Sequence, residues 1–296
     1  MLHTVTIGIA AFNEANNIRA LLDALLRQNT ETFQLEMILV VSDASTDDTD
    51  SIVKEFEHHH NVVLYRMPER SGANQVQNTI MEKNESDILV VLDADIIPED
   101  EHFIAELVAP LIQNQAVALT SAEILPVPPR TFVEKVLARN HLWKTELFRQ
   151  RTRQDTVYMC FGPARAFSRD MMTMRYTLSV PVDAYSYFWC KKIGKQFVSV
   201  RRSRALFRCP NNLSDHFKQS RRFQVGRQSI ISIFGKDAED AYSLPKGEML
   251  PALIREACVH PILFLSFLVV SFMANSKQAT TFQSKWDMAE SSKKVL

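Results

Sequence analysis

Glycine is scarce in this chain. Its 296 residues include only 7 glycines, and neither a GxGxxG nor a GxxxxGK[ST] motif occurs. Dinucleotide-binding dehydrogenases and P-loop NTPases hold phosphates in such loops, so both classes are disfavoured. The four cysteines are widely separated and form no CxxC pair, which argues against a zinc site or a disulfide framework. The formal net charge is zero and gives no indication of a nucleic-acid partner.

Apolar runs of strand length alternate with amphipathic stretches in the first half of the chain. Strands that are apolar throughout and connected by helices indicate an α/β fold with a mostly parallel sheet covered on both faces. The predicted strands are 4–12, 35–43, 61–67 and 87–93, and the predicted helices are 13–28, 44–57 and 72–83.

Polar residues follow each predicted strand. In a parallel α/β sheet, ligands bind beyond the carboxyl ends of the strands. We therefore expect four polar clusters to lie on one rim of the sheet. They are Asn13–Glu14, Asp43, the turn Arg70–Ser71–Gly72, and Asp93–Ala94–Asp95.

The stretch 88–99, ILVVLDADIIPE, ends an apolar run on Asp93 and Asp95. Two ionised carboxylates at the edge of a core are costly, and each raises the cost of the other. Mg²⁺ or Mn²⁺ removes that cost, because these ions prefer oxygen ligands. The pair is therefore a predicted metal site. The alternative is two solvated loop aspartates, since aspartate and proline often follow a strand.

Seven segments follow one another between residues 4 and 235: AAFNEANNI, VVSDASTDDT, RSGANQVQN, VVLDADIIPED, CFGPARAFSRDMM, VDAYSYFWCKKIGKQFVSV and QSRRF. In this order and spacing they resemble the inverting glycosyltransferases of family 2, which have the GT-A fold, a Rossmann-like sheet flanked by helices. In this resemblance Asp93–Asp95 is the DxD motif and 219–223 is a QxxRW-like motif with Phe in place of Trp.

The resemblance implies a nucleotide-sugar donor site. It assigns binding of Mn²⁺ or Mg²⁺ to Asp95 and Asp93, where the ion neutralises the departing diphosphate. It assigns donor binding to a larger set of residues: Asn13, Glu14, Asp43, Arg70, Asp93, Gln219, Arg222 and Phe223.

The resemblance also implies a catalytic base. Inversion by a single displacement requires a group that takes the proton of the acceptor hydroxyl. Asp183 occupies the matching position, at the start of a predicted helix whose dipole stabilises an anion. The alternative is that Asp183 is the N-cap of this helix.

The expected function is that of a hexosyltransferase. It moves a sugar with inversion from a nucleotide-diphosphate donor, a UDP-sugar, to a saccharide or lipid-linked acceptor in glycan biosynthesis. Ser42, Ala73 and Val182 depart from the family pattern and favour, as an alternative, a degenerate fold acting as a binding or scaffold protein. A nucleotidyltransferase is disfavoured, because the segment IGIAAFNEANN has no glycine-rich basic loop.

Residues 257–276 contain no Asp, Glu, Lys or Arg. About 20 helical residues cross the hydrocarbon layer, so this segment is expected to span a membrane, to lie in its interface or to be a core helix. We expect residues 1–235 to form the GT-A catalytic domain and 236–296 a helical, membrane-associated segment. The N-terminal run lacks a basic leader, which favours the cytoplasmic face of a membrane.

Overall fold

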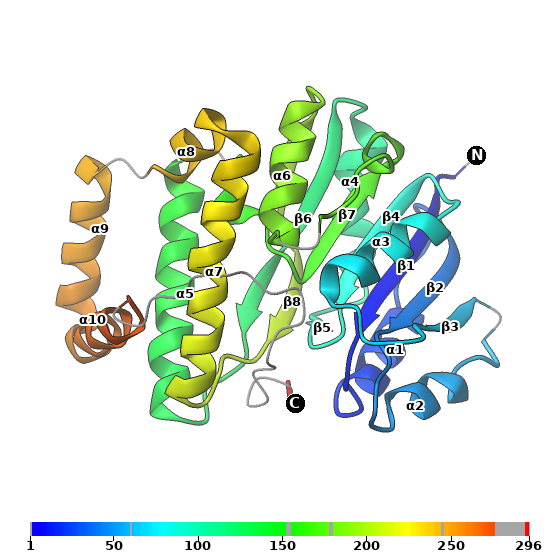
Figure 1. Ribbon diagram of the computed structural model, residues 1–296, viewed down its shortest axis with the longest axis horizontal. Helices are drawn as coiled ribbons and strands as arrows, with labels where there is room; N and C mark the ends of the chain where they lie inside the picture. The colour runs from blue at the N-terminus through cyan, green and yellow to red at the C-terminus, as the bar shows by residue number, and fades with distance from the viewer. Residues whose placement is uncertain are drawn as a thin grey trace.

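A single sheet forms the centre of the protein (Figure 1). The computed structural model describes residues 2–59, 61–151, 155–177, 180–243, 246–275 and 294–295. Within these ranges, eight strands pair in the order β3-β2-β1-β4-β7-β6-β8-β5. The strands are β1 (Thr4–Ala11), β2 (Gln34–Ser42), β3 (Val62–Arg66), β4 (Ile88–Asp93), β5 (Ile97–Pro98), β6 (Val117–Pro126), β7 (Ala164–Ser168) and β8 (Gln196–Phe207).

The sheet is mostly parallel, as predicted. Strands β3, β2, β1 and β4 are parallel neighbours, and β6 is parallel to β8. The exceptions are β7, which is antiparallel to both β4 and β6, and β5, which is antiparallel to β8. The expected α/β architecture is therefore confirmed.

Helices cover both faces of the sheet (Figure 1). They are α1 (Ile18–Leu26), α2 (Thr49–Glu55), α3 (Ala73–Lys83), α4 (Phe103–Gln113), α5 (Phe132–Arg151), α6 (Val182–Lys192), α7 (Leu213–Phe234), α8 (Lys236–Tyr242), α9 (Lys246–Val259) and α10 (Pro261–Asn275). Alternate residues of β4 face opposite ways: Val90 packs in a core with α1 and α4, whereas Val91 packs in a core with α3 and α6. This alternation explains why β4 is apolar along its whole length.

Two helices begin later than their sequence pattern predicts. Helix α1 starts at Ile18 and not at residue 13, and α2 starts at Thr49 and not at residue 44. Asn13 and Ala44 have φ angles of 54° and 55°, which place them in the left-handed region. A right-handed α-helix does not accommodate a residue with such a φ angle. Asn13 and Ala44 therefore belong to the loops before α1 and α2 and not to the helices.

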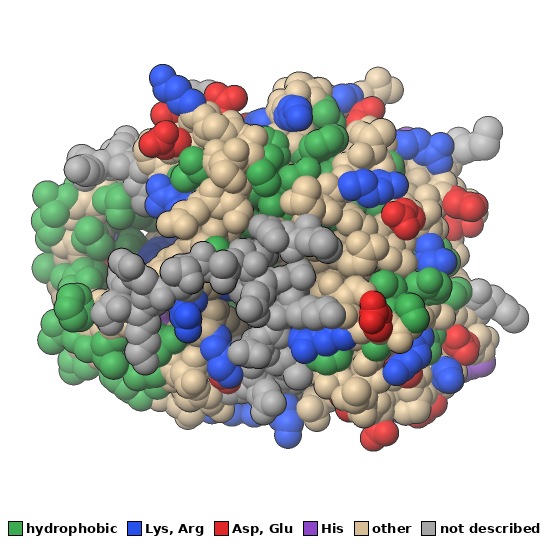
Figure 2. Space-filling model, in the orientation of Figure 1, with side chains coloured by type: hydrophobic (Ala, Val, Ile, Leu, Met, Phe, Trp, Pro, Cys, Tyr) green, Lys and Arg blue, Asp and Glu red, His purple; other side chains and the backbone are tan. Residues whose placement is uncertain are grey.

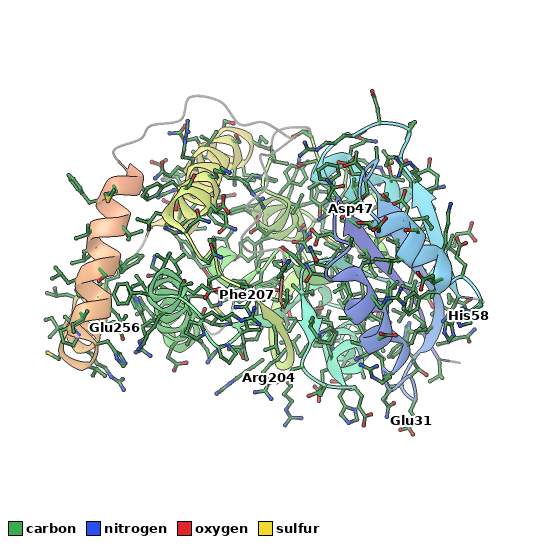
Figure 3. The ribbon with its side chains drawn as sticks, turned by 90° about the horizontal axis from the view of Figure 1, so that it is seen from below. Glu31, Asp47, His58, Arg204, Phe207 and Glu256 are labelled. Carbon is green, nitrogen blue, oxygen red and sulfur yellow. The ribbon has the colours of Figure 1, made fainter. Side chains whose placement is uncertain are left out.

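The C-terminal helices pack on α5. Glu256 of α9 accepts two hydrogen bonds of 2.5 Å from Arg139 of α5 (Figure 3), and the Lys144 ammonium lies 4.8 Å from the ring centre of Phe267 on α10. Of the helices in the described ranges, none has both the length and the apolar character needed to cross a membrane. Ser276, the last residue of the predicted segment, lies outside those ranges.

Helix α10 is not a core helix. The exposed fractions of Ile262, Leu265 and Phe272 are 71%, 64% and 77%. Figure 2 shows hydrophobic side chains gathered over α9 and α10 at one end of the molecule. Of the three alternatives for 257–276, a core helix does not fit these exposed side chains.

Candidate active site

The loop after β1 is bound to the loop after β2. The backbone N–H of Asn13 donates to Ser45 Oγ at 3.1 Å, and Asn13 Oδ1 accepts the N–H of Thr46 at 2.8 Å. The N–H of Glu14 donates to Thr49 Oγ1 at 2.7 Å. Asn13 and Glu14 therefore lie where the sequence predicts them, at the rim beside the end of β2.

Asp43 holds the loop that precedes α3. This buried carboxylate accepts the backbone N–H of Ser71 at 2.6 Å and that of Gly72 at 2.8 Å. Gly72 has a φ of 90°, a conformation that glycine adopts without the steric cost of a side chain. Arg70, in the same loop, lies with its guanidinium 4.2 Å from the ring centre of Phe12. These predicted donor residues thus lie close to the loop after β1.

Three aspartates form an acidic cluster, which we define as Asp93, Asp95 and Asp183. Burial raises the pKa of Asp93 to about 7, with the negative charge of Asp95 as the second cause and that of Asp183 as a smaller one. The positive charges of Arg165 and Arg222 oppose this rise. The backbone N–H of Asp93 donates to Pro163 O at 2.9 Å, and the preceding residue, Gly162, lies beside Asp183, so the fold brings Asp183 close to Asp93.

Asp183 lies in the first turn of α6. The helix begins at Val182 with Pro181 at the N-cap position, so the alternative that Asp183 is the N-cap is wrong. A Cβ placed on Gly162 would lie 3.6 Å from the Cβ of Asp183 and 3.8 Å from its Oδ2. Gly162 therefore presents only backbone to this carboxylate.

Helix α7 contributes the QxxRW-like segment. The positive charge of Arg222 lowers the pKa of Asp93 and so opposes the effects of burial and of Asp95. Gln219 is half-buried, whereas Arg222 is exposed and Phe223 is 61% exposed. Of these three residues, Arg222 is the one whose charge acts on Asp93, and Phe223 extends toward solvent.

Asp93 and Asp95 suit a divalent ion that also binds phosphate oxygens. In the part of the chain that the structure describes, no group of three or more His, Cys, Asp or Glu side chains is arranged to hold a metal ion. Mg²⁺ and similar ions commonly use only one or two carboxylates, with water and substrate phosphates as the other ligands. Burial, and then the charge of Asp95, raises the pKa of Asp93, and a bound cation would oppose both effects. The pair therefore fits such an ion.

Arg165 was not predicted from the sequence as a site residue. It lies in β7, is fully buried, and donates hydrogen bonds to Gly162 O and Val182 O, and both of these residues are neighbours of Asp183. The only local signal is a charged residue inside the otherwise apolar strand ARAFS.

Residues 294–295 also lie against the predicted donor site. The N–H of Val295 donates to Asn17 Oδ1 at 3.2 Å, and Asn17 Nδ2 donates to Glu14 Oε2 at 3.0 Å. Arg208 donates to the carbonyl oxygens of Lys294 and Val295 and pairs with Glu134 at 3.1 Å. No sequence pattern predicts the contacts of residues 294–295, because their partners Asn17 and Arg208 are distant in the sequence.

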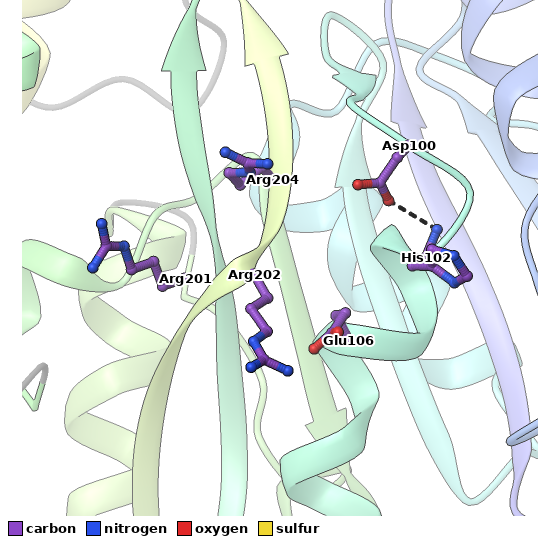
Figure 4. A pocket seen from close by; sticks show the side chains of 6 residues that line it. All are labelled: Asp100, His102, Glu106, Arg201, Arg202 and Arg204. Atoms are coloured by element: carbon purple, nitrogen blue, oxygen red, sulfur yellow. Dashed lines mark hydrogen bonds between the residues drawn. The ribbon is translucent and has the colours of Figure 1, made fainter.

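A separate cleft of about 600 Å³ opens beside β8 (Figure 4). It is lined by charged side chains of both signs and His102, and Arg204 in it pairs with Glu99 at 2.6 Å. None of the predicted site residues lines it. The lining residues are Asp100, His102, Glu106, Arg201, Arg202 and Arg204.

The chain matches a family model described as glycosyl transferase family 2 over residues 6–173. It is 28% identical to glycosyltransferase GlyA of Streptococcus pneumoniae over 112 residues, which are 38% of this chain and 16% of GlyA. It is 32% identical to glycosyltransferase AglE of Haloferax volcanii over 98 residues, which are 33% of this chain and 32% of AglE. The aligned stretches thus span less than a third of either relative.

Two solved structures have a similar fold. The mannosyltransferase PcManGT from Pyrobaculum calidifontis, in complex with GDP-Man and Mn²⁺, has a TM-score of 0.60 and 18% identity, covering 95% of this chain and 77% of that chain. Glucosyl-3-phosphoglycerate synthase from Mycobacterium tuberculosis, in complex with Mn²⁺, UDP and phosphoglyceric acid, has a TM-score of 0.56 and 18% identity, covering 79% of each chain. The likeness confirms the expected GT-A-type fold.

Proposed function

Because the chain belongs to glycosyl transferase family 2, we propose that it is an inverting hexosyltransferase that uses a UDP-sugar. The acceptor is a saccharide or a lipid-linked molecule in glycan biosynthesis. One observation carries this proposal: Asp183 lies beside Gly162, and the next residue, Pro163, accepts the backbone N–H of Asp93 at 2.9 Å, although Asp93 and Asp183 are far apart in the sequence. A base and a cation-binding pair at one place are what a single displacement at a sugar carbon requires.

Donor binding is assigned to the rim residues. The loops that carry Asn13, Glu14, Asp43 and Arg70 are tied to one another by hydrogen bonds, which supports a pre-formed pocket for the nucleotide. Asp93 and Asp95 would hold Mn²⁺ or Mg²⁺, which neutralises charge on the leaving diphosphate when bound. Gln219, Arg222 and Phe223 of α7 would complete the donor site, with Arg222 adding positive charge near the phosphates.

Asp183 is the proposed general base. Its position in the first turn of α6 places the carboxylate in the positive field of the helix N-terminus, which favours the ionised form that accepts a proton. Gly162 itself places no side-chain atom beside Oδ2, and this supports the approach of an acceptor hydroxyl to Asp183.

The test is a donor screen with product analysis. Purified full-length chain is incubated with Mn²⁺ and each of several UDP-sugars and GDP-mannose, and release of nucleoside diphosphate is followed with and without EDTA. Metal-dependent release supports the enzyme, and NMR of the product anomer tests inversion. If the chain binds nucleotide but releases nucleoside diphosphate from none of these donors, the proposed enzyme activity is contradicted.

A degenerate scaffold is the second candidate. The Asp43 carboxylate is engaged by backbone N–H groups of its own chain, and the Ser42 hydroxyl donates to Ser45 Oγ at 3.0 Å. Both observations favour a structural use of residues that the family resemblance assigns to the donor. A scaffold would bind no UDP-sugar, so calorimetric titration with UDP and Mn²⁺ separates the two candidates.

Placement at a membrane surface also belongs to the proposal. We assign residues 1–235 to the catalytic domain and 236–296 to a helical segment that contacts the cytoplasmic face of a membrane. The exposed apolar side chains of α9 and α10 support this contact, because large apolar patches on soluble surfaces are uncommon. Helix α10 also contacts α7, whose lysine and arginine side chains favour anionic headgroups.

A further inference from the structure

Arg165 is a fully buried cation in β7, between β4 and β6. Each of its nitrogens donates to a neutral acceptor. The acceptors are Gly162 O at 3.1 Å, Tyr176 Oη at 3.0 Å, Val182 O at 2.8 Å, Ser186 Oγ at 2.6 Å and Gln77 Oε1 at 2.7 Å. They come from α3, from α6 and from the chain on either side of β7, so Arg165 joins segments that are distant in the sequence.

The charge of Arg165 has no directly bonded partner. Within the described ranges, each of its hydrogen bonds goes to an uncharged oxygen and none to a carboxylate. A buried cation without a bonded anion is costly unless other charges compensate it. The carboxylates that act on Arg165 through space are Asp183 and Asp93 of the acidic cluster.

The hydrogen bonds of Arg165 also reach two neighbours of Asp183. A Cβ placed on Gly162 would lie 3.6 Å from Asp183 Cβ, so Gly162 lies beside Asp183, and Val182 is the residue before it. Arg165 binds the carbonyl oxygens of both, and Ser186 ties the next turn of α6 to the same guanidinium. The position of the Asp183 carboxylate therefore depends on a planar group that fixes both flanking segments at once.

We propose that Arg165 is the positioning residue of the acidic cluster: it sets the orientation of Asp183 and supplies the buried positive charge behind Asp183 and Asp93. This assignment rests on the proposed function, in which Asp183 is the base. Arg165 does not touch substrate. Its planar fork of donors is what the arrangement requires, because a lysine ammonium is a single point with three donors and cannot reach the same set of acceptors.

Arg165→Lys tests the proposal, because it keeps the charge and removes the fork. We expect the nucleotide–Mn²⁺ dissociation constant and the donor KM to stay within about threefold of the wild-type values. We expect kcat to fall by about 10- to 100-fold, since a displaced base loses most of its contribution. Thr120→Val is the matched control: it removes a buried 2.8 Å hydrogen bond to Leu107 O from the adjacent strand, away from Asp183.

The two variants separate positioning from general stability. The proposal requires a much larger fall in kcat for Arg165→Lys than for Thr120→Val at comparable melting temperatures. Equal falls in kcat that follow the loss of stability would overturn it, and so would a wild-type kcat in a folded Arg165→Lys chain. An inactive wild-type chain would instead overturn the proposed function and this assignment with it. Arg165→Met, which removes charge and fork, is expected to lower kcat further if it folds.

Discussion

The carboxylate of Asp43 accepts a 2.8 Å hydrogen bond from the backbone N–H of Gly72. This contact joins the end of β2 to the start of α3. A residue that the family resemblance assigns to the donor therefore also shapes the loop that forms one side of the donor site.

Asp43→Asn is expected to destabilise the protein. The amide keeps one oxygen but turns an NH₂ group toward a backbone N–H, so one buried donor loses its partner. The free energy of unfolding should fall by about 1–3 kcal/mol, measured by urea denaturation without ligand. Asp100→Asn, in an exposed loop where the carboxylate accepts the N–H of His102, is the control and should change little. Unchanged stability with weaker UDP binding would assign Asp43 to the donor alone.

Asp95→Ala is expected to abolish metal-dependent transfer and to leave the fold intact. Asp95 lies on the rim, only partly buried, so its loss should change the melting temperature by no more than a few degrees. Loss of a metal ligand should lower kcat by at least about 10²-fold. Activity assays at several Mn²⁺ concentrations check this. Wild-type activity in the variant, or wild-type activity that EDTA does not change, would remove the metal role.

Asp183→Asn is expected to keep donor binding and to lose transfer. The amide preserves the shape of the side chain, so the UDP dissociation constant should stay close to that of the wild type. Without a carboxylate to accept the hydroxyl proton, kcat should fall by about 10²- to 10⁴-fold. Single-turnover measurements and calorimetry together check this. A parallel loss of melting temperature and of activity would favour a structural role for Asp183.

Asp93 predicts a pH dependence of stability in the metal-free protein. Burial and the charge of Asp95 raise the pKa of Asp93 to about 7 in the folded state, whereas that of an unfolded aspartate is about 3.9. Between these values the native state binds more protons than the unfolded state, so this group's contribution to stability is present below about pH 4 and is lost as the pH rises to about 7.

Asp93→Asn removes that dependence. With EDTA present, the variant should gain stability relative to the wild type as the pH increases from 5 to 8, with a change of roughly 2 kcal/mol. Urea denaturation at four pH values measures the difference. Asp170→Asn, at an exposed aspartate that pairs with Lys195, is the control and should give curves parallel to those of the wild type. Parallel curves for Asp93→Asn would refute the prediction.

The apolar face of α10 predicts binding to lipid. Replacing Leu265 and Phe272 with glutamate removes two exposed apolar side chains and adds two negative charges to that face. Association with vesicles containing anionic lipid should fall by at least about tenfold, because each buried apolar side chain contributes about 1.5–3 kcal/mol. Vesicle flotation measures this. Val63→Glu on β3, at the opposite end of the protein (Figure 1), is the control. Equal flotation of all three chains would show that α10 is not the contact.

Local sequence pattern was enough to predict the alternation of strands and helices and the rim on which Asn13, Asp43 and Asp93 lie. An apolar run of strand length is visible in the residues of the strand itself. The polar residues directly after it lie at the carboxyl end of the strand, which is the ligand-binding edge of a parallel sheet. The late starts of α1 and α2 were missed, because loop contacts to Ser45 and Thr46 hold Asn13 in the left-handed region.

Only the tertiary structure decided what surrounds each site residue. The backbone partners of Asp43, the buried charge of Arg165 beside Asp183, and the bond from Val295 to Asn17 all join segments that are distant in the sequence. Burial and electrostatic coupling depend on which atoms meet after folding, and no spacing of residues along the chain encodes them. The amino-acid order thus specifies which residues reach the rim, while packing across the sheet specifies their charge state and orientation.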